Sequence, residues 1–96
     1  MESVILKLFV LGDTPRSRRA IEAIERLCTQ ADAGERCDLT VVDLEADPAA
    51  AEEYNIIAAP VLVRERPGPM RQVVGDLGDL ERVIESLELP FASPDL

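Results

Sequence analysis

Residues 4–11 are apolar at every position except Lys7. A nearly continuous apolar run is typical of a strand that is buried on both faces, in a sheet covered by helices. A Gly-Asp pair ends the run, and Thr14 and Pro15 then supply a hydroxyl cap and a proline suited to the first position of a helix. The sequence therefore predicts a buried strand that turns directly into a helix, as in α/β domains.

The predicted helix begins at Pro15 and ends before Gly34, because glycine commonly follows the last turn of a helix. A single apolar stripe runs along it and would face the core. The stripe consists of Ala20, Ile21, Ile24, Leu27, Cys28 and Ala31.

The rest of the chain alternates strand and helix signals, with turn residues between them. Asp47-Pro48 repeats the cap-plus-proline signal, and Pro60 should stand at the first residue of a strand or at a sheet edge. We expect strands over 39–44, 56–63 and 71–74, a short helix over 49–54 and a last helix that begins after the Asp79 cap and is ended by Pro90.

The expected order is β-α-β-α-β-β-α. Two parallel strands joined by a right-handed crossover, followed by a hairpin and a closing helix, make a thioredoxin-like α/β layer. We expect a single domain over residues 1–90 and a short tail over 91–96. Residues 46–63 are rich in Ala at first and in Ile and Val later, so their short helix could re-form if the strands paired differently.

The composition excludes several functional classes. The 96 residues carry a formal net charge of −9, which argues against nucleic-acid binding, and they include no His, which excludes Ser-His-Asp and Cys-His catalysis and His-based metal sites. No apolar run approaches the roughly 20 residues that span a bilayer, and no signal peptide is apparent. We expect a cytoplasmic protein without metal, cofactor, nucleic acid or membrane among its ligands.

The turn after the first strand is the place where a thioredoxin-like domain carries its chemistry, since a cysteine at the helix start gains a lowered pKa. A glutaredoxin-type Cys-Pro-x-Ser would match this turn, but Thr14 occupies the position of the cysteine. A hydroxyl cannot exchange disulfides, so we expect no enzyme. Cys28 is expected to be a buried thiol on the helix, and Cys37 a free, half-exposed thiol in the loop after it.

Two further features bear on this turn. In thioredoxin-like folds a cis-proline opens the third strand and faces the first turn, which would be the role of Pro60; outside that context an ordinary trans proline is the default. Gly75-Asp76 would place a carboxylate near a ligand, or would simply form a turn. An alternative function is therefore a redox-inactive, glutaredoxin-like domain that binds glutathione through Thr14, Pro60 and Asp76, or an adaptor domain.

Basic residues fall in two clusters, although the chain is acidic overall. Three crowd the first turn of the first helix, where positive charge opposes the helix dipole, and three flank the Pro-Gly-Pro turn. Such clusters indicate either an acidic partner surface or two solvated faces. The residues are Arg16, Arg18, Arg19, Arg64, Arg66 and Arg71.

Three blocks of the chain, in this order, resemble the KaiB family of circadian clock proteins. They are residues 6–17 (LKLFVLGDTPRS), 59–62 (APVL) and 73–79 (VVGDLGD), within a resemblance that extends from about Val4 to about Leu89.

The resemblance implies a non-enzymatic, fold-switching protein. In the family's ground state, a tetramer, the order is β-α-β-β-α-α-β; in a rarer monomer the C-terminal half becomes α-β-β-α and the fold is thioredoxin-like. That monomer binds the N-terminal ATPase ring of the KaiC kinase, and in the cyanobacterial clock the resulting complex captures KaiA and competes for output kinases. The family's switch positions correspond here to Pro60, Pro67, Pro69, Gly75, Asp76 and Asp79, and its basic partner contacts to Lys7, Arg19 and Arg71.

The chain departs from the family pattern near the second strand. Thr40 and Ala46 stand where proteins of the KaiA-dependent clock carry lysines. The resemblance therefore favours a system without KaiA, with a KaiC-type hexamer as partner, an output kinase as a further candidate, and a tetramer or dimer as the ground state.

Overall fold

A computed structural model describes residues 3–30 and 36–92. Four strands form one sheet in the order β2-β1-β3-β4. β1 runs parallel to β2 and antiparallel to β3, and β3 and β4 form an antiparallel hairpin. The strands are β1 (Val4–Val10), β2 (Cys37–Asp43), β3 (Val61–Arg66) and β4 (Arg71–Val74).

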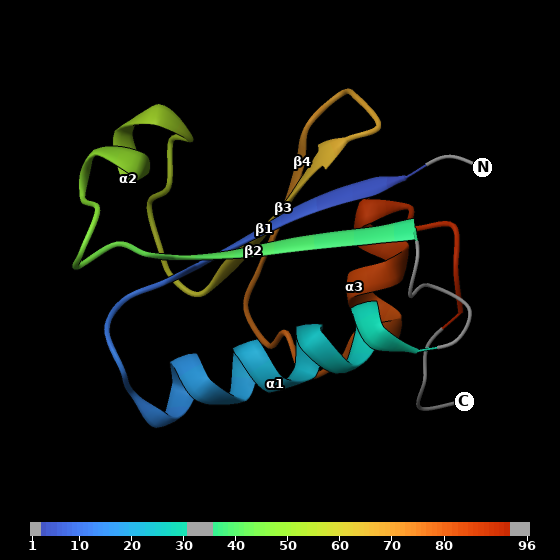
Figure 1. Cartoon of the computed structure of the whole chain (residues 1–96), viewed down its shortest axis with the longest axis horizontal. Helices are drawn as coiled ribbons and strands as arrows, with labels where there is room; N and C mark the ends of the chain where they lie inside the picture. The colour runs from blue at the N-terminus through green and yellow to red at the C-terminus, as the bar shows by residue number, and fades with distance from the viewer. Residues whose placement is uncertain (1–2, 31–35, 93–96) are drawn as a thin grey trace.

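Three helices complete the expected order β-α-β-α-β-β-α, which is confirmed. α1 (Pro15–Thr29) and α3 (Leu80–Leu87) cover one face of the sheet, and α2 (Ala49–Glu53) lies beyond the other face at one end (Figure 1). Of the two arrangements expected for the C-terminal half, the structure therefore has α-β-β-α, the thioredoxin-like one.

The core is divided between the two faces of the sheet. Alternate residues of β1, from Val4 to Val10, pack with α1 and α3 in the larger apolar cluster, whereas Phe9 points to the other face and packs with Leu44, Ala50 and Val61. The strand alternates because successive side chains point to opposite faces.

The expectation that β1 is buried on both faces is only partly right. Ile5 and Lys7 are half-exposed, since α2 has five residues and covers the second face only around Phe9. This face is consequently open over β2, where Asp38 and Thr40 are exposed, whereas Val63 of β3 is fully buried.

Several element boundaries differ from the sequence expectation, among them the start of β2, which lies at Cys37 rather than at residue 39. The third strand begins at Val61, directly after the cis Ala59–Pro60 bond, and the preceding Ile57 is 99% exposed. α1 ends at Thr29, and Gly34 lies outside the described residues.

The tail expected over residues 91–96 is only partly described by the structure. Phe91 is 5% exposed and belongs to the larger apolar cluster, whereas residues 93–96 lie outside the described part.

The prediction of two free cysteines is wrong, because Cys28 and Cys37 form a disulfide. Cys37 is the first residue of β2 rather than a loop residue, and it pairs in register with Val4 on the sheet face that α1 covers. This arrangement brings the two Cα atoms within 5.3 Å, a normal distance for a disulfide.

Within the described ranges, no helix combines the length and the apolar character needed to cross a membrane.

Candidate functional site

A groove of about 330 Å³ opens where the first turn of α1 meets the segments before β3 and α3. Arg16, Arg19 and Ala20 line it from α1. Pro60 and residues 75–78 complete its lining. The structure thus brings together five residues singled out in the sequence: Arg16, Arg19, Pro60, Gly75 and Asp76.

Thr14 is occupied with capping α1 and is not among the residues that line the groove. Its Oγ1 accepts a hydrogen bond from the Ser17 N–H at 3.0 Å and donates one to Ser17 Oγ at 3.1 Å. Ser17 is buried, so this pair belongs to the base of the helix. The position that carries the thiol in redox-active relatives of this fold is therefore a structural cap.

Asp43 fixes the turn that leads into α1, and sequence reasoning missed it. Its Oδ1 accepts hydrogen bonds from the backbone N–H groups of Gly12 at 3.0 Å and Glu45 at 2.9 Å. These bonds lower the pKa of the Asp43 carboxyl below its ordinary value, with Gly12 as the larger cause. Asp43 pairs in register with Val10, so the parallel pairing of β1 and β2 places it there.

Gly12 itself is required in this turn. Its φ is +73°, and a Cβ added there would lie 2.9 Å from the Glu45 carboxylate.

Two arginines give the groove its charge. The first turn of α1 contains no acidic residue, and within the described part of the chain neither Arg16 nor Arg19 has an ion pair or hydrogen bond. All three arginines are exposed, but Arg18, by contrast, pairs with Asp13 at 2.7 Å. In a chain with net charge −9, unpaired cations beside a groove favour binding of an acidic group.

The turn before α3 presents a carboxylate to the same groove. Gly75 adopts a φ of +110°, which favours glycine, and Asp76 Oδ1 accepts a hydrogen bond from Gly78 N at 2.9 Å. The Arg82 guanidinium donates to the Asp76 carbonyl oxygen at 2.8 Å, and Asp79 caps α3 by accepting from Arg82 N at 3.3 Å. The turn is thereby held against the first turn of α3.

Lys7 lies elsewhere, on the partly open face of the sheet. Its Nζ donates to the Tyr54 hydroxyl at 2.6 Å and lies 3.3 Å from Glu65 Oε2. The Tyr54 hydrogen bond, assisted by the Glu65 carboxylate, raises the pKa of Lys7 above its ordinary value. These two partners are distant in sequence from Lys7, and no local signal pointed to them.

The basic cluster expected around the Pro-Gly-Pro turn does not form as a surface. Arg64 is 5% exposed, and its guanidinium donates to the carbonyl oxygens of Leu87 at 2.7 Å and Pro69 at 2.8 Å. Arg71 remains exposed and pairs with Glu88 at 3.1 Å. Arg64 faces inward because it pairs in register with Leu6, on the sheet face that the helices cover.

Pro67 and Pro69 occupy the β3–β4 hairpin, and neither is among the residues that line the groove. Both follow cis peptide bonds, as does Pro60. The residues expected to contact a partner are therefore dispersed: Arg19 is in the groove, Lys7 is on the open face and Arg71 is on β4.

Across residues 3–30 and 36–92, no group of three or more Cys, Asp or Glu side chains lies close enough to hold a metal ion.

Comparisons with known proteins give a family match over most of the chain. The KaiB domain family matches residues 7–89. The circadian clock oscillator protein KaiB of Prochlorococcus marinus is 41% identical over 90 residues, which are 94% of this chain and 76% of that protein.

Solved structures share the fold. The N-terminal domain of Synechococcus elongatus SasA superposes with a TM-score of 0.72 at 23% identity, over 96% of this chain and 90% of that one. Mitochondrial thioredoxin 3 of Saccharomyces cerevisiae gives 0.69 at 18% identity, over 91% and 81%. The thioredoxin-like fold expected from the sequence is confirmed.

Proposed function

The chain belongs to the KaiB family of circadian clock proteins, and we propose that it is a non-enzymatic clock or timer protein that binds the N-terminal ATPase ring of a KaiC-type kinase hexamer. By binding in the fold described above, it regulates the phosphorylation cycle of that kinase.

One observation carries this proposal. The site where this fold would perform thiol chemistry contains Thr14, whose hydroxyl is committed to Ser17, while two unpaired arginines stand at the adjacent groove. A thioredoxin-like scaffold without its thiol retains a concave, positively charged surface for binding. We assign Arg19, with Arg16 beside it, as the contact for an acidic segment of the partner.

Lys7 and Arg71, which lie outside the groove, are secondary candidates for contacts with the partner. Each already has an acidic neighbour in this chain, Glu65 and Glu88 respectively. A partner carboxylate would have to compete with these pairs, so their replacement should weaken binding less than replacement of Arg19.

Fold switching is the second part of the proposal. The ground state is a tetramer or dimer in which the C-terminal half is rearranged, and the switched monomer is the binding form. Pro60, Gly75 and Asp76 then line the groove only in the binding form, because the turns that carry them belong to the α-β-β-α arrangement. Asp79 caps α3, and Pro67 and Pro69 shape the hairpin, in that same arrangement.

We further propose that the partner system lacks KaiA. Thr40 and Ala46 are exposed on and just after β2, where lysines mark the KaiA-dependent proteins. An output histidine kinase that shares the thioredoxin-like domain would compete for the same ring.

The binding test mixes the full chain with a KaiC-type hexamer loaded with ADP, or with a non-hydrolysable ATP analogue, and measures the complex by size-exclusion chromatography with light scattering. We expect a complex with the ADP-loaded hexamer and a loss of at least roughly tenfold in affinity for Arg19→Glu. Arg26→Glu is the matched control, since it makes the same charge change on α1 away from the groove. Equal affinities for the two variants would contradict the assignment of the groove.

Switching is tested by NMR on the free protein across dilution and temperature. We expect two sets of backbone signals for residues in the C-terminal half, with populations that change with concentration. A single set under all conditions, together with no binding to the ADP-loaded hexamer, would remove the proposal.

A glutathione-binding domain remains a second candidate, because the groove combines two arginines with the Asp76 carboxylate and so suits a zwitterionic peptide. Thr14 does not line this groove, which weakens the case for it as a glutathione ligand. A thermal-shift titration decides, since no shift at millimolar glutathione would exclude this function.

A further inference from the structure

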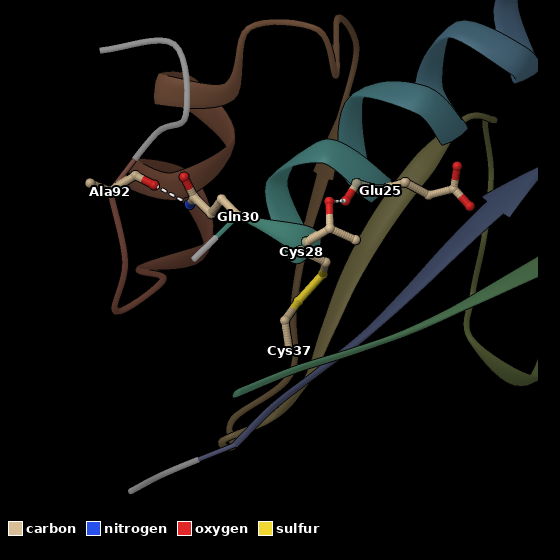
Figure 2. Close-up of a disulfide and its surroundings, with 6 residues drawn as sticks. Glu25, Cys28, Gln30, Cys37 and Ala92 are labelled. Carbon is tan, nitrogen blue, oxygen red and sulfur yellow. Dashed lines mark hydrogen bonds between the residues drawn. A yellow bond between two sulfur atoms is a disulfide. The ribbon is translucent and has the colours of Figure 1, made fainter. Parts of the chain in front are cut away.

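The disulfide between Cys28 and Cys37 joins the last turn of α1 to the first residue of β2 (Figure 2). These are the only two cysteines of the chain. Cys28 is 6% exposed, whereas Cys37 is half-buried at the end of an edge strand.

Residues close to both cysteines hold the segment that follows α3. Gln30, two positions after Cys28, donates a side-chain hydrogen bond to the carbonyl oxygen of Ala92 (Figure 2). Arg36, directly before Cys37, reaches the Pro90 carbonyl oxygen at 3.5 Å, and its guanidinium lies 5.8 Å from the centre of the Phe91 ring.

Two side chains that neighbour the disulfide in sequence, Gln30 and Arg36, therefore clamp residues 90–92 against the N-terminal half of the protein. Phe91, between these contacts, is itself packed in the core with α1 and α3. The clamped segment begins three residues after the end of α3, so the disulfide supports the placement of α3 as well.

We propose that Cys28–Cys37 is a reversible redox lock: a dithiol reductant opens it, and opening releases the clamp on residues 90–92. A cavity of about 420 Å³ lies beside both cysteines and is also lined by Glu25, Thr29 and Leu39. The cavity gives an incoming thiolate access to the disulfide from the side of Cys37, the more exposed of the two residues.

The chemistry is thiol–disulfide exchange in two steps. A thiolate of the dithiol attacks Cys37 Sγ, the Cys28–Cys37 bond breaks, and Cys28 leaves as a thiolate that takes up a proton. The second thiol of the reductant, after losing its proton, then attacks its own mixed disulfide and releases Cys37 as a thiolate, which is protonated. Two electrons and two protons pass to the protein, and the dithiol becomes a disulfide.

The expected effect on folding follows from the length of the closed loop. The bond spans a sequence separation of 9 residues, and releasing a loop of this size should lower the ratio of folded to unfolded chains by roughly 80-fold. The loss is not confined to α1 and β2, because the clamp transmits it to the end of α3. The regulatory consequence rests on the proposed function: the oxidised protein favours the fold that binds the partner, and reduction disfavours it.

The test uses the full chain without any partner, oxidised or treated with dithiothreitol under native conditions. Maleimide labelling and mass spectrometry count the thiols, and hydrogen exchange reports on peptides covering residues 84–92. We expect two labelled thiols per reduced chain and exchange that is faster by at least roughly tenfold in that peptide. The peptide covering α2, on the other side of the sheet, is the internal control.

Two variants separate the clamp from the bond. Gln30→Ala with Arg36→Ala, in the oxidised state, should already show fast exchange at residues 84–92, and reduction should add little. Cys28→Ser with Cys37→Ser should exchange like the reduced wild type in either buffer; if this variant does not fold, reduction of the wild type still decides.

Absence of labelled thiols after dithiothreitol would show that the disulfide is a fixed structural bond and would overturn the proposal. Labelled thiols with unchanged exchange at residues 84–92 would overturn the clamp. Because no hexamer is present, a failure of partner binding would count against the proposed function alone.

Discussion

Replacement of Arg64 by methionine tests how a buried cation holds the C-terminal half together. The guanidinium bonds the carbonyl oxygen of Leu87, in the last turn of α3, and that of Pro69, in the β3–β4 turn. Its Nε is buried without a hydrogen-bond partner in the described part of the chain. Arg64 therefore links a helix end to a hairpin, and a carboxylate is not among its partners in these contacts.

The magnitude follows from the groups left unsatisfied. The Leu87 carbonyl, in a buried bond, costs about 3 kcal/mol when it loses its donor, and the Pro69 carbonyl, in a partly buried bond, costs about 1 kcal/mol, so the two together cost about 4 kcal/mol. Removing the unpartnered Nε recovers about 1–2 kcal/mol, and the methionine side chain fills much of the space. We expect Arg64→Met to lower the free energy of unfolding by about 2–3 kcal/mol.

Urea unfolding and calorimetry measure this loss. With an unfolding entropy of about 2.1 cal/mol/K per residue and 96 residues, the expected fall in Tm is about 10–15 °C. Arg64→Lys should be intermediate, because an ammonium lacks the fork that reaches both carbonyls.

Arg66→Met, at an exposed position of the same strand, is the matched control and should change stability by less than about 0.5 kcal/mol. If Arg64→Met is no more destabilising than Arg66→Met, the argument that the two carbonyls depend on Arg64 is refuted.

Three further predictions concern the first turn and the disulfide. Thr14→Ala should cost about 1 kcal/mol in urea unfolding, because it removes the N-cap of α1, whereas Thr14→Ser should be nearly neutral; equal losses would contradict the capping role. The pKa of the Asp43 carboxyl is lowered on folding, so its ionised form stabilises the folded protein. This contribution to the free energy of unfolding is fully present above the ordinary carboxyl pKa of about 3.9, and it is lost as pH falls through the lower pKa of the folded state. Asp43→Asn should therefore flatten the acid limb of the stability curve measured from pH 7 downwards, and an unchanged limb would refute this. Cys28→Ser with Cys37→Ser should lower the free energy of unfolding by about 2.6 kcal/mol, from the entropy of a nine-residue loop, and calorimetry under reducing conditions should show wild type and variant with the same Tm.

The order of elements was predictable from the sequence because its signals are local. Thr14-Pro15 marked the start of α1 and Asp79 the start of α3, and the predicted bounds of the last strand match those observed. The end of α3 was less exact, because the helix stops at Leu87, before Pro90. Caps, prolines and apolar periodicity act over a few neighbouring residues, so a single sequence contains them. The absence of a thiol at Thr14 was likewise visible at once, and with it the argument against redox chemistry at that turn.

The candidate site was predictable only in part, because its members come from three segments. The groove unites Arg19, Pro60 and Asp76, all singled out in the sequence, since the fold expectation placed their segments at the same end of the sheet. It does not include Thr14, whose hydroxyl turns to Ser17 instead. Which cations remain unpaired depends on contacts that spacing along the chain does not reveal.

By itself, the sequence determined the succession of strands and helices, the helix caps and the absence of a thiol at position 14. Each of these depends only on residues that are adjacent along the chain. Tertiary structure alone decided that Arg64 is buried, that Lys7 meets Tyr54 and that Cys37 meets Cys28. These outcomes depend on strand register, where a shift of one residue would send each side chain to the opposite face of the sheet. Register is set by the packing of the whole chain. It places Cys37 of β2 beside Cys28 of α1, so the two cysteines that were expected to be free form a disulfide.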